Sequence, residues 1–270
     1  VPALRCTFVT GAVSPNMNAT VAACQTAVAD LDVPANCRTV ESRLESLPDR
    51  VDLACFPEYA LTGFVPDERV HEAAIDPDGD AVARVRTAAS KAGCDVLVGF
   101  LERTGSRPHN ALAYLVPDGR TTVYRKRHLR GGETDVLRAG EERVTVETPL
   151  GTAGLLACYD LNFVVDSAAL TDRGVDALLI AGAWPATHAA NWRLLVRARA
   201  LDGVRWAVGA GRTGRRDVAG APVVEYAGRS LLARPDGGIR AELGTDERDL
   251  VADLDRAVLE RQRDLVGIGG

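Results

Sequence analysis

Short apolar runs alternate with amphipathic segments along most of this chain. Runs such as Val51-Asp-Leu-Ala-Cys-Phe56 are typical of buried strands, whereas the segments between them repeat apolar residues at helical spacing. The pattern predicts strands at 20–24, 51–56, 95–101, 153–158, 176–182, 204–210 and 250–254, and helices at 36–47, 80–92, 165–173, 188–202 and 255–263. Buried strands that alternate with helices predict an α/β fold with the helices outside.

Two hairpins are also visible in the sequence. The run 111–116 turns at Pro117-Asp-Gly-Arg120 into 121–125, and the run 230–234 turns at Pro235-Asp-Gly-Gly238. Hairpins add antiparallel strands, so we expect mixed sheets. At the helix ends, Asn36 is expected to be an N-cap and Gly93 to follow the end of helix 80–92.

Composition excludes some classes of partner. The chain has 270 residues and a net charge of −5, with charges of both signs interspersed, which argues against nucleic acid because its binders usually show basic patches. No apolar stretch approaches the roughly 20 residues that a membrane-spanning helix needs. We therefore expect neither nucleic acid nor a membrane as partner.

The six cysteines form no CxxC pair and show no Cys/His spacing typical of zinc, so no metal site is expected. The N-terminal stretch is a poor match to a signal peptide, and we expect a reducing, cytoplasmic location. Met17 is the only methionine, and the first convincing strand begins just after it. We expect residues 1–16 to be an N-terminal extension, followed by a single domain over 17–270.

Cys158 stands where an apolar run ends and polar residues begin. The run 153–157 is followed by Cys158, Tyr159 and Asp160, as when a strand delivers a nucleophile to its C-terminal edge. That edge is where open α/β sheets build their sites. Taken alone, a thiol in this setting is more typical of a core residue, since free cysteine behaves as a small hydrophobe.

Two charged residues stand at the ends of other predicted strands. Glu58 follows a strand stopped by Pro57, and its apolar neighbours would help such a carboxylate exchange protons near neutral pH. Lys126 ends the second strand of the first hairpin and could stabilise a developing oxyanion. Each alone is more typical of a solvated residue, a loop carboxylate or a basic strand edge.

Glu58, Lys126 and Cys158 taken together favour a catalytic role over a structural one. A thiolate nucleophile needs a base to take its proton and a cation to favour its charge. Glu58 can serve as the base and Lys126 as the cation. A Cys–His arrangement with His128 is the alternative and has less support, because all four histidines fall in positions typical of loops or helix starts.

Three segments resemble the signatures of the nitrilase superfamily, the carbon-nitrogen hydrolases, in that family's order. They are Phe56-Pro-Glu-Tyr-Ala-Leu-Thr-Gly-Phe64, Tyr124-Arg-Lys-Arg-His-Leu129 and Leu156-Ala-Cys-Tyr-Asp160. Weaker similarities occur at Ala23-Cys-Gln25, Asn110, Ala183-Trp-Pro185, Arg197-Ala-Arg-Ala-Leu201 and Gly228-Arg-Ser230. The resemblance implies a four-layer α-β-β-α sandwich and a protein that commonly pairs into dimers, so we expect a homodimer or a higher homo-oligomer.

The resemblance also implies roles for individual residues. Glu58 would be the general base, Lys126 the oxyanion stabiliser and Cys158 the nucleophile, while Glu133 would help to position substrate or water. The backbone N–H of Tyr159 would be the second oxyanion donor. No cofactor is implied. We expect four side chains to contact the small-molecule amide substrate: Tyr59, Tyr159, Asn162 and Trp184.

The residues after the thiol help to choose a reaction. Tyr159-Asp160 resembles the amidase and carbamoylase branches, whereas nitrilases of the family typically have Trp-Glu. Many members of those branches have an arginine where this chain has Asn162, and in several of them the arginine binds a substrate carboxylate. The sequence therefore favours a neutral amide or one anchored differently, with Arg212 and Arg229 among the candidates to compensate.

Three alternatives to amide hydrolysis stay open at this point. The same triad could hydrolyse a nitrile or transfer the acyl group to an amine. A non-catalytic relative that serves as a binding protein is the third, although it predicts a disrupted triad, and all three residues are present.

Overall fold

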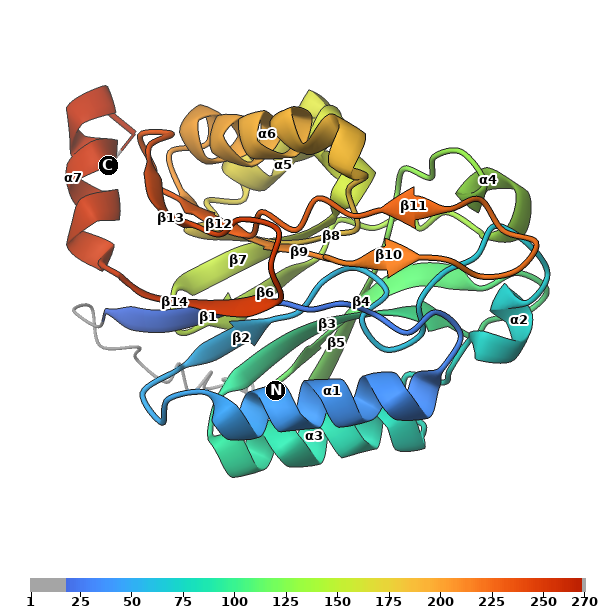
Figure 1. Ribbon diagram of the computed structural model, residues 1–270. Coiled ribbons are helices and arrows are strands. Elements are labelled where there is room, and N and C mark those ends of the chain that lie inside the picture. The colour runs from blue at the N-terminus through green and yellow to red at the C-terminus, as the bar shows by residue number, and fades with distance from the viewer. Residues whose placement is uncertain (1–17, 269–270) are drawn as a thin grey trace, which may run out of the picture.

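Two six-stranded sheets lie face to face between two pairs of helices in the computed structural model (Figure 1). This arrangement confirms the predicted four-layer α-β-β-α sandwich. The structure describes residues 18–268, so the extension expected at 1–16 lies outside the described residues.

The first sheet has a parallel centre and antiparallel edges. Its strands, in spatial order, are β14 (Arg248–Leu254), β1 (Ala19–Gln25), β2 (Leu53–Cys55), β3 (Asp95–Glu102), β4 (His109–Leu115) and β5 (Thr121–Arg125). Strands β1, β2 and β3 are parallel, whereas β14, β4 and β5 pair antiparallel with their neighbours. The predicted first hairpin is therefore the β4–β5 edge of this sheet.

The second sheet repeats this plan. Its strands, in spatial order, are β13 (Ile239–Glu242), β12 (Leu231–Ala233), β9 (Trp206–Gly211), β8 (Ala177–Gly182), β7 (Gly151–Ala157) and β6 (Thr145–Thr148). Strands β7, β8 and β9 are parallel, and the outer strands pair antiparallel. The second predicted hairpin is β12–β13, and β6 is a strand that the sequence pattern did not predict.

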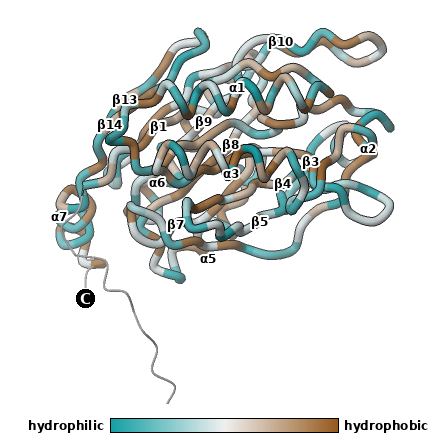
Figure 2. Tube along the Cα trace, turned by 90° about the horizontal axis from the view of Figure 1, so that it is seen from below, coloured by the Kyte–Doolittle hydropathy of each residue, from teal (hydrophilic) through white to brown (hydrophobic). Residues whose placement is uncertain are grey.

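Alternation along the strands builds one core between the sheets and one core on each outer face. In β1, Val21 and Ala23 face the other sheet, whereas Ala22 and Cys24 face the helices, because successive strand side chains point to opposite sides. Helices α1 (Val33–Ser46) and α3 (Asp80–Ala92) cover the first sheet, and α5 (Val164–Asp172) and α6 (Ala189–Asp202) cover the second (Figure 1). Hydrophilic and hydrophobic residues alternate along α1 and α3 (Figure 2), as amphipathic helices require.

The predicted start of the first helix was wrong. We expected Asn36 to cap the first helix, but α1 begins at Val33 and its N-cap is Asp32, whose carboxylate accepts from the backbone N–H of Ala35 at 2.9 Å. Asn36 is buried instead and exchanges two hydrogen bonds with the backbone of Ala29. The end of α3 was predicted correctly, because Gly93 takes a left-handed conformation there with φ of 68°.

Short elements complete the structure. These are α2 (Val70–Ala73), α4 (Glu133–Val136), the 3-10 helices η1 (Cys158–Asn162) and η2 (Ala186–His188), the ribbon strands β10 (Arg215–Arg216) and β11 (Val224–Glu225), and the terminal helix α7 (Arg256–Val266). Among residues 18–268, no helix combines the length and the apolar character that a membrane crossing needs.

Candidate active site

Strand directions bring the predicted site residues to one edge of the sandwich. Glu58 follows the C-terminal end of β2, Cys158 follows β7 and Ala183 follows β8. Lys126 follows the antiparallel strand β5, whose end pairs with the start of β4. Residues from four strands of two sheets therefore meet, as is usual at the carboxyl edge of parallel strands.

Gly99 allows the loop of Glu58 to lie close against β3. A Cβ atom at Gly99 would lie 2.5 Å from the carbonyl oxygen of Pro57 and 2.8 Å from the Cα atom of Glu58, closer than such contacts occur. Only glycine fits at this position. The loop is also bound to β3 by the hydrogen bond from Leu61 N to the carbonyl of Gly99, at 3.0 Å.

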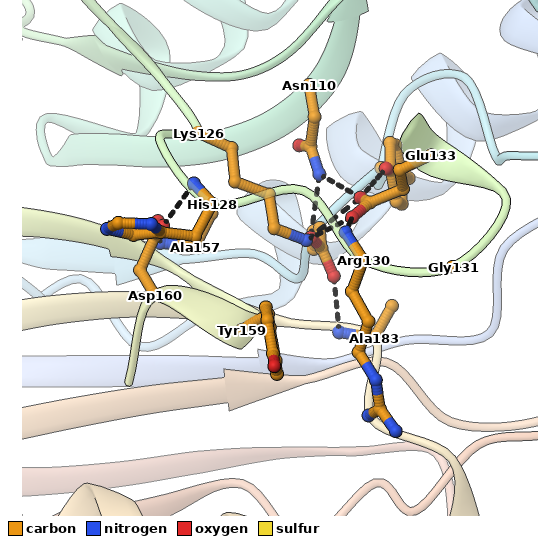
Figure 3. A network of polar contacts seen from close by, with 12 residues as sticks. Asn110, Lys126, His128, Arg130, Gly131, Glu133, Ala157, Tyr159, Asp160 and Ala183 are labelled. Atoms are coloured by element: carbon orange, nitrogen blue, oxygen red, sulfur yellow. Dashed lines mark hydrogen bonds and ion pairs between the residues drawn. The ribbon is translucent and has the colours of Figure 1, made fainter. Parts of the chain in front are cut away.

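The ammonium group of Lys126 lies between two buried carboxylates (Figure 3). Its Nζ donates to Glu58 Oε1 at 2.8 Å and to both carboxylate oxygens of Glu133 at 2.8 and 2.9 Å. The amide of Asn110 donates to the same two carboxylates at 2.7 and 2.9 Å. The second oxygen of Glu58 accepts from the backbone N–H of Ala183 at 2.9 Å, which ties this site to the second sheet.

The charges of this cluster stabilise one another. Burial alone would lower the pKa of Lys126, but the charges of Glu133 and Glu58 hold it well above its ordinary value. Burial opposes ionisation of Glu133, yet Lys126 and the hydroxyl of Tyr59, which donates to that carboxylate, lower its pKa. Lys126 and Glu133 are therefore charged at neutral pH, and the ammonium group is held in place.

Cys158 begins the 3-10 helix η1 in a left-handed conformation with φ of 47°. This value is unusual for a residue with a side chain, and such conformations concentrate at functional sites. Burial raises the pKa of the half-buried thiol well above its ordinary value, and the charge of Glu58 adds to this, while Lys126 acts in the opposite direction. The resting side chain is therefore a thiol, and such a group becomes a nucleophile only when a base takes its proton.

Asp160 anchors the turn that carries Cys158. Its carboxylate accepts from the hydroxyl of Tyr124 at 2.5 Å and from the backbone N–H groups of Ala157 and His128 at 3.0 Å each. Figure 3 shows the contact with His128. Burial raises its pKa to about 6, although Lys126 and these hydrogen bonds oppose the shift. Asp160 thus joins the turn after β7 to the segment after β5, which carries Lys126.

A cavity of about 380 Å³ opens beside the thiol. Its lining combines the catalytic candidates with aromatic side chains and two arginines; it consists of Glu58, Tyr59, Phe64, Lys126, Arg130, Gly131, Gly132, Glu133, Cys158, Tyr159, Ala183, Trp184, Pro185, Thr187, His188, Arg216, Val224 and Tyr226. A cavity of this size accommodates a small molecule.

The structure brings together most of the residues predicted for the site. Glu58, Lys126, Glu133 and Cys158 line the cavity, as do Tyr59, Tyr159 and Trp184. Asn162 is the exception: its side chain is exposed, donates to the carbonyl of Tyr159 at 3.1 Å and is not part of the cavity lining.

Sequence reasoning missed other residues of the site. Asn110 and the N–H of Ala183 had been noted only for their similarity to family segments, and nothing in the sequence indicated that both would bind Glu58. Arg130 lies only four residues after Lys126 and could have been found from that spacing. Arg216 lies on β10 and Tyr226 directly follows β11, and the position of this ribbon beside the cavity depends on the tertiary fold.

One cluster in the described chain has ligand atoms close enough to hold a metal ion. Atoms of His128, Asp160 and Asp166 lie within 4.8 Å of one another. Asp166, however, already binds the side chains of Arg127, His128 and Arg143, whose charges and hydrogen bonds lower its pKa against the effect of burial. We assign this cluster to anchoring and no metal to it.

Comparison with known proteins gives consistent results. The family model described as carbon-nitrogen hydrolase matches residues 20–264. The omega-amidase YafV of Escherichia coli is 30% identical over 87% of this chain and 89% of its own. An (R)-stereoselective amidase of a Pseudomonas species is 28% identical over 88% of this chain and 86% of its own.

Solved structures agree with the sequence comparison. A carbon-nitrogen hydrolase superfamily protein of Xanthomonas campestris, whose crystal structure has an arsenic adduct in the active site, superposes with a TM-score of 0.83 at 28% identity and covers 93% of this chain and 96% of that one. Nit3 of Saccharomyces cerevisiae, a nitrilase superfamily member, shares the fold with a TM-score of 0.84 at 24% identity over 96% and 98% of the two chains. The chain therefore belongs to the carbon-nitrogen hydrolase family, enzymes that hydrolyse carbon–nitrogen bonds other than peptide bonds.

Proposed function

We propose that this protein hydrolyses a small amide through a thioester on Cys158, with Glu58 as general base and Lys126 as oxyanion stabiliser. The observation that carries this proposal is the buried contact between Lys126 and Glu58 at 2.8 Å in the cavity that Cys158 also lines. The two relatives described above are named as amidases, which supports an amide rather than a nitrile as substrate.

The first half of the reaction forms the thioester. Glu58 takes the proton of the Cys158 thiol as sulfur attacks the amide carbonyl carbon. The carbonyl oxygen becomes negative and is stabilised by the ammonium group of Lys126 and by the backbone N–H of Tyr159, whose place in the first turn of η1 leaves it without an acceptor in that turn. The C–N bond then breaks, and the leaving ammonia or amine takes the proton from Glu58.

The second half releases the acid. Water attacks the thioester carbonyl while Glu58 takes a proton from the water molecule. Lys126 and the N–H of Tyr159 stabilise the oxyanion again. The C–S bond then breaks, and Glu58 returns the proton to the sulfur of Cys158. Glu133 keeps Lys126 in position throughout, because two of the three contacts that Nζ makes with carboxylate oxygens are to Glu133. This chemistry requires neither a metal nor an organic cofactor. The cytoplasmic location expected from the sequence stays a prediction.

Product analysis separates this reaction from its alternatives. Incubation with butyramide should release ammonia and butyrate in equal amounts, whereas butyronitrile should release neither. Added hydroxylamine should divert part of the acyl group to the hydroxamate without being required for turnover. Faster turnover of the nitrile, or ammonia release only when an amine acceptor is present, would contradict hydrolysis of the amide as the main reaction.

We also propose that the protein forms a homodimer through α5 and α6. These neighbouring helices expose large apolar side chains: Val164 and Val165 are 60% and 59% exposed, and Leu194 and Leu201 are 62% and 53% exposed. Leu194 and Leu201 are seven residues apart and so share one face of α6. Patches of this kind mark protein–protein contacts.

Sedimentation tests the assembly. The wild-type protein should have the mass of two chains, and the double variant Leu194→Glu, Leu201→Glu should have the mass of one. Leu265→Glu on α7, where the leucine is 78% exposed, is the matched control and should not change the mass. A wild-type monomer at tens of micromolar, or a double variant that stays dimeric, would exclude this interface.

A further inference from the structure

Arg216 is a buried cation in the wall of the catalytic cavity. It lies on β10, lines the cavity together with Cys158 and is only 6% exposed. Its Nε and Nη2 donate to the carbonyl oxygen of Pro222 at 3.1 and 3.0 Å, and its Nη1 donates to that of Phe64 at 3.1 Å. These bonds use three of the five N–H donors of the guanidinium group, so one donor on each Nη is left for another acceptor.

The other buried arginines of the described chain have a carboxylate partner. Arg199 and Arg205 pair with Asp202, and the Nη2 of Arg212 is 2.7 Å from Asp30. No described carboxylate lies within ion-pair distance of Arg216. Removing a guanidinium charge from water without a counter-ion is costly, so an unpaired buried arginine in a cavity indicates that the ligand supplies the anion.

The carboxylates near Arg216 do not take that role. Glu58 and Glu133 line the same cavity, but both bind Lys126. Asp67 is partly exposed and its pKa is lowered mainly by its hydrogen bond with Arg69, with a smaller effect from the charge of Arg216.

A second arginine adds to the positive charge of the cavity. Arg130 is exposed at the cavity, and its guanidinium group lies 5.3 Å from the ring centre of Tyr159 (Figure 3). Arg130 and Arg216 come from different segments of the chain, and both line the cavity. The cavity therefore has three cationic side chains, those of Lys126, Arg130 and Arg216, against the two carboxylates of Glu58 and Glu133. This excess of positive charge favours an anionic ligand.

We propose that Arg216 binds a carboxylate group of the substrate, so that the preferred substrates are amides that also carry a carboxylate. This inference rests on the proposed amide hydrolysis. Asn162 stands where many similar enzymes have an arginine, so a substrate carboxylate needs another cation. In this protein that cation comes from the β10–β11 ribbon and not from the turn after Cys158. Neither arginine considered from the sequence takes this role: Arg212 is paired with Asp30, and Arg229 is not part of the cavity lining.

The experiment compares anionic and neutral amides of similar size. Its substrates are the monoamides of succinic, glutaric and adipic acid, which carry the carboxylate on the acyl side, N-butyrylglycine, which carries it on the amine side, and the neutral amides butyramide and pentanamide. The wild-type protein should have a higher kcat/KM for at least one anionic amide than for either neutral amide. Which anionic amide is preferred shows on which side of the scissile bond the carboxylate binds.

Variants test the residue. Arg216→Gln should lower kcat/KM for the preferred anionic amide by roughly 10- to 100-fold more than for the neutral amides, mainly through KM, because a charged hydrogen-bonded contact is lost. Arg216→Lys keeps the charge and should recover part of the preference. Arg215→Gln is the matched control: Arg215 is the adjacent residue on β10, is exposed and pairs with Asp217, and its loss should leave the preference unchanged.

Two results would overturn the inference. One is a wild-type protein that hydrolyses the neutral amides at least as well as every anionic amide. The other is an Arg216→Gln variant that loses the same factor on both kinds of substrate, which would show that Arg216 only holds the loops at Phe64 and Pro222. If the Arg216→Gln variant does not fold, inhibition of the wild-type protein tests the inference instead. Glutarate should then inhibit butyramide hydrolysis more strongly than pentanoate. Failure to hydrolyse any amide would instead refute the proposed function.

Discussion

Replacing Cys158 with alanine should reduce kcat by at least about 10⁴-fold while leaving the fold intact. The variant loses the only nucleophile of the proposed reaction, and enzymes with covalent catalysis lose a factor on the order of 10⁴ to 10⁶ when the nucleophile is removed. The fold should persist because the side chain is half-buried and Asp160 holds the turn through its three hydrogen bonds. Steady-state kinetics and the thermal unfolding midpoint measure the two effects.

Cys94→Ala is the matched control for this variant. Cys94 is a free, buried cysteine of the core between the first sheet and its helices. Its truncation should lower stability by about 1–2 kcal/mol and leave kcat within a few-fold of the wild-type value. Retained turnover in Cys158→Ala, with unchanged kcat/KM, would place the nucleophile elsewhere and refute our assignment.

Replacing Lys126 with methionine should lower both activity and stability. The ammonium group is the cation in contact with Glu58 and Glu133, and its removal leaves two buried carboxylates without a counter-ion. Breaking a buried ion pair by removing one partner typically costs about 3–5 kcal/mol, because the remaining charge stays buried. We also expect kcat to fall by about 10²-fold or more, since one of the two oxyanion donors is lost.

The stability of this variant should depend on pH in the opposite sense to the wild type. In the wild type the folded pKa of Glu133 is lowered, so its contribution is present above the unfolded pKa and is lost as pH falls through the folded pKa. Without Lys126, burial should raise the folded pKa of Glu133, so the charged carboxylate is disfavoured and stability should fall as pH rises. Urea unfolding at pH 5 and pH 8 measures this, and the destabilisation relative to wild type should be larger at pH 8.

Lys91→Met provides the control, because Lys91 is the other lysine of the chain and lies exposed near the end of α3. It should change neither activity nor the pH profile. An equal loss of stability at both pH values in Lys126→Met would mean that Lys126 contributes by packing alone, and unchanged kcat would contradict its role at the oxyanion.

Local pattern was sufficient for much of the fold. The apolar runs located the central strands of both sheets, because buried parallel strands read as short apolar segments whatever their neighbours are. The edge strand β6 and the ribbon β10–β11 were missed, since their stability comes from tertiary pairing and their residues lack an apolar run. The first helix was predicted to start too late because Asp32 and Asn36 are both good caps, and only the structure shows that Asn36 is bound to Ala29.

The candidate site was predictable where it follows the ends of strands. Glu58, Lys126 and Cys158 were found because each terminates a run that the sequence shows. Arg216 could not be found in this way, because its significance depends on burial and on the absence of a carboxylate within reach among the described residues. Asn162 was expected to contact substrate because many similar amidases and carbamoylases have an arginine at this position, but in this structure the Asn162 side chain, at the end of η1, is exposed to solvent.

The proposed thioester mechanism is tested most directly by identifying the residue that carries the acyl group during turnover. Wild-type protein is mixed with butyramide, quenched in acid within milliseconds to seconds, and measured intact and after digestion by mass spectrometry. We predict a butyryl adduct on the peptide that contains Cys158, removed by hydroxylamine and absent from Cys158→Ala. An adduct on another residue, or unchanged turnover after complete alkylation of Cys158, would contradict the proposed thioester on Cys158.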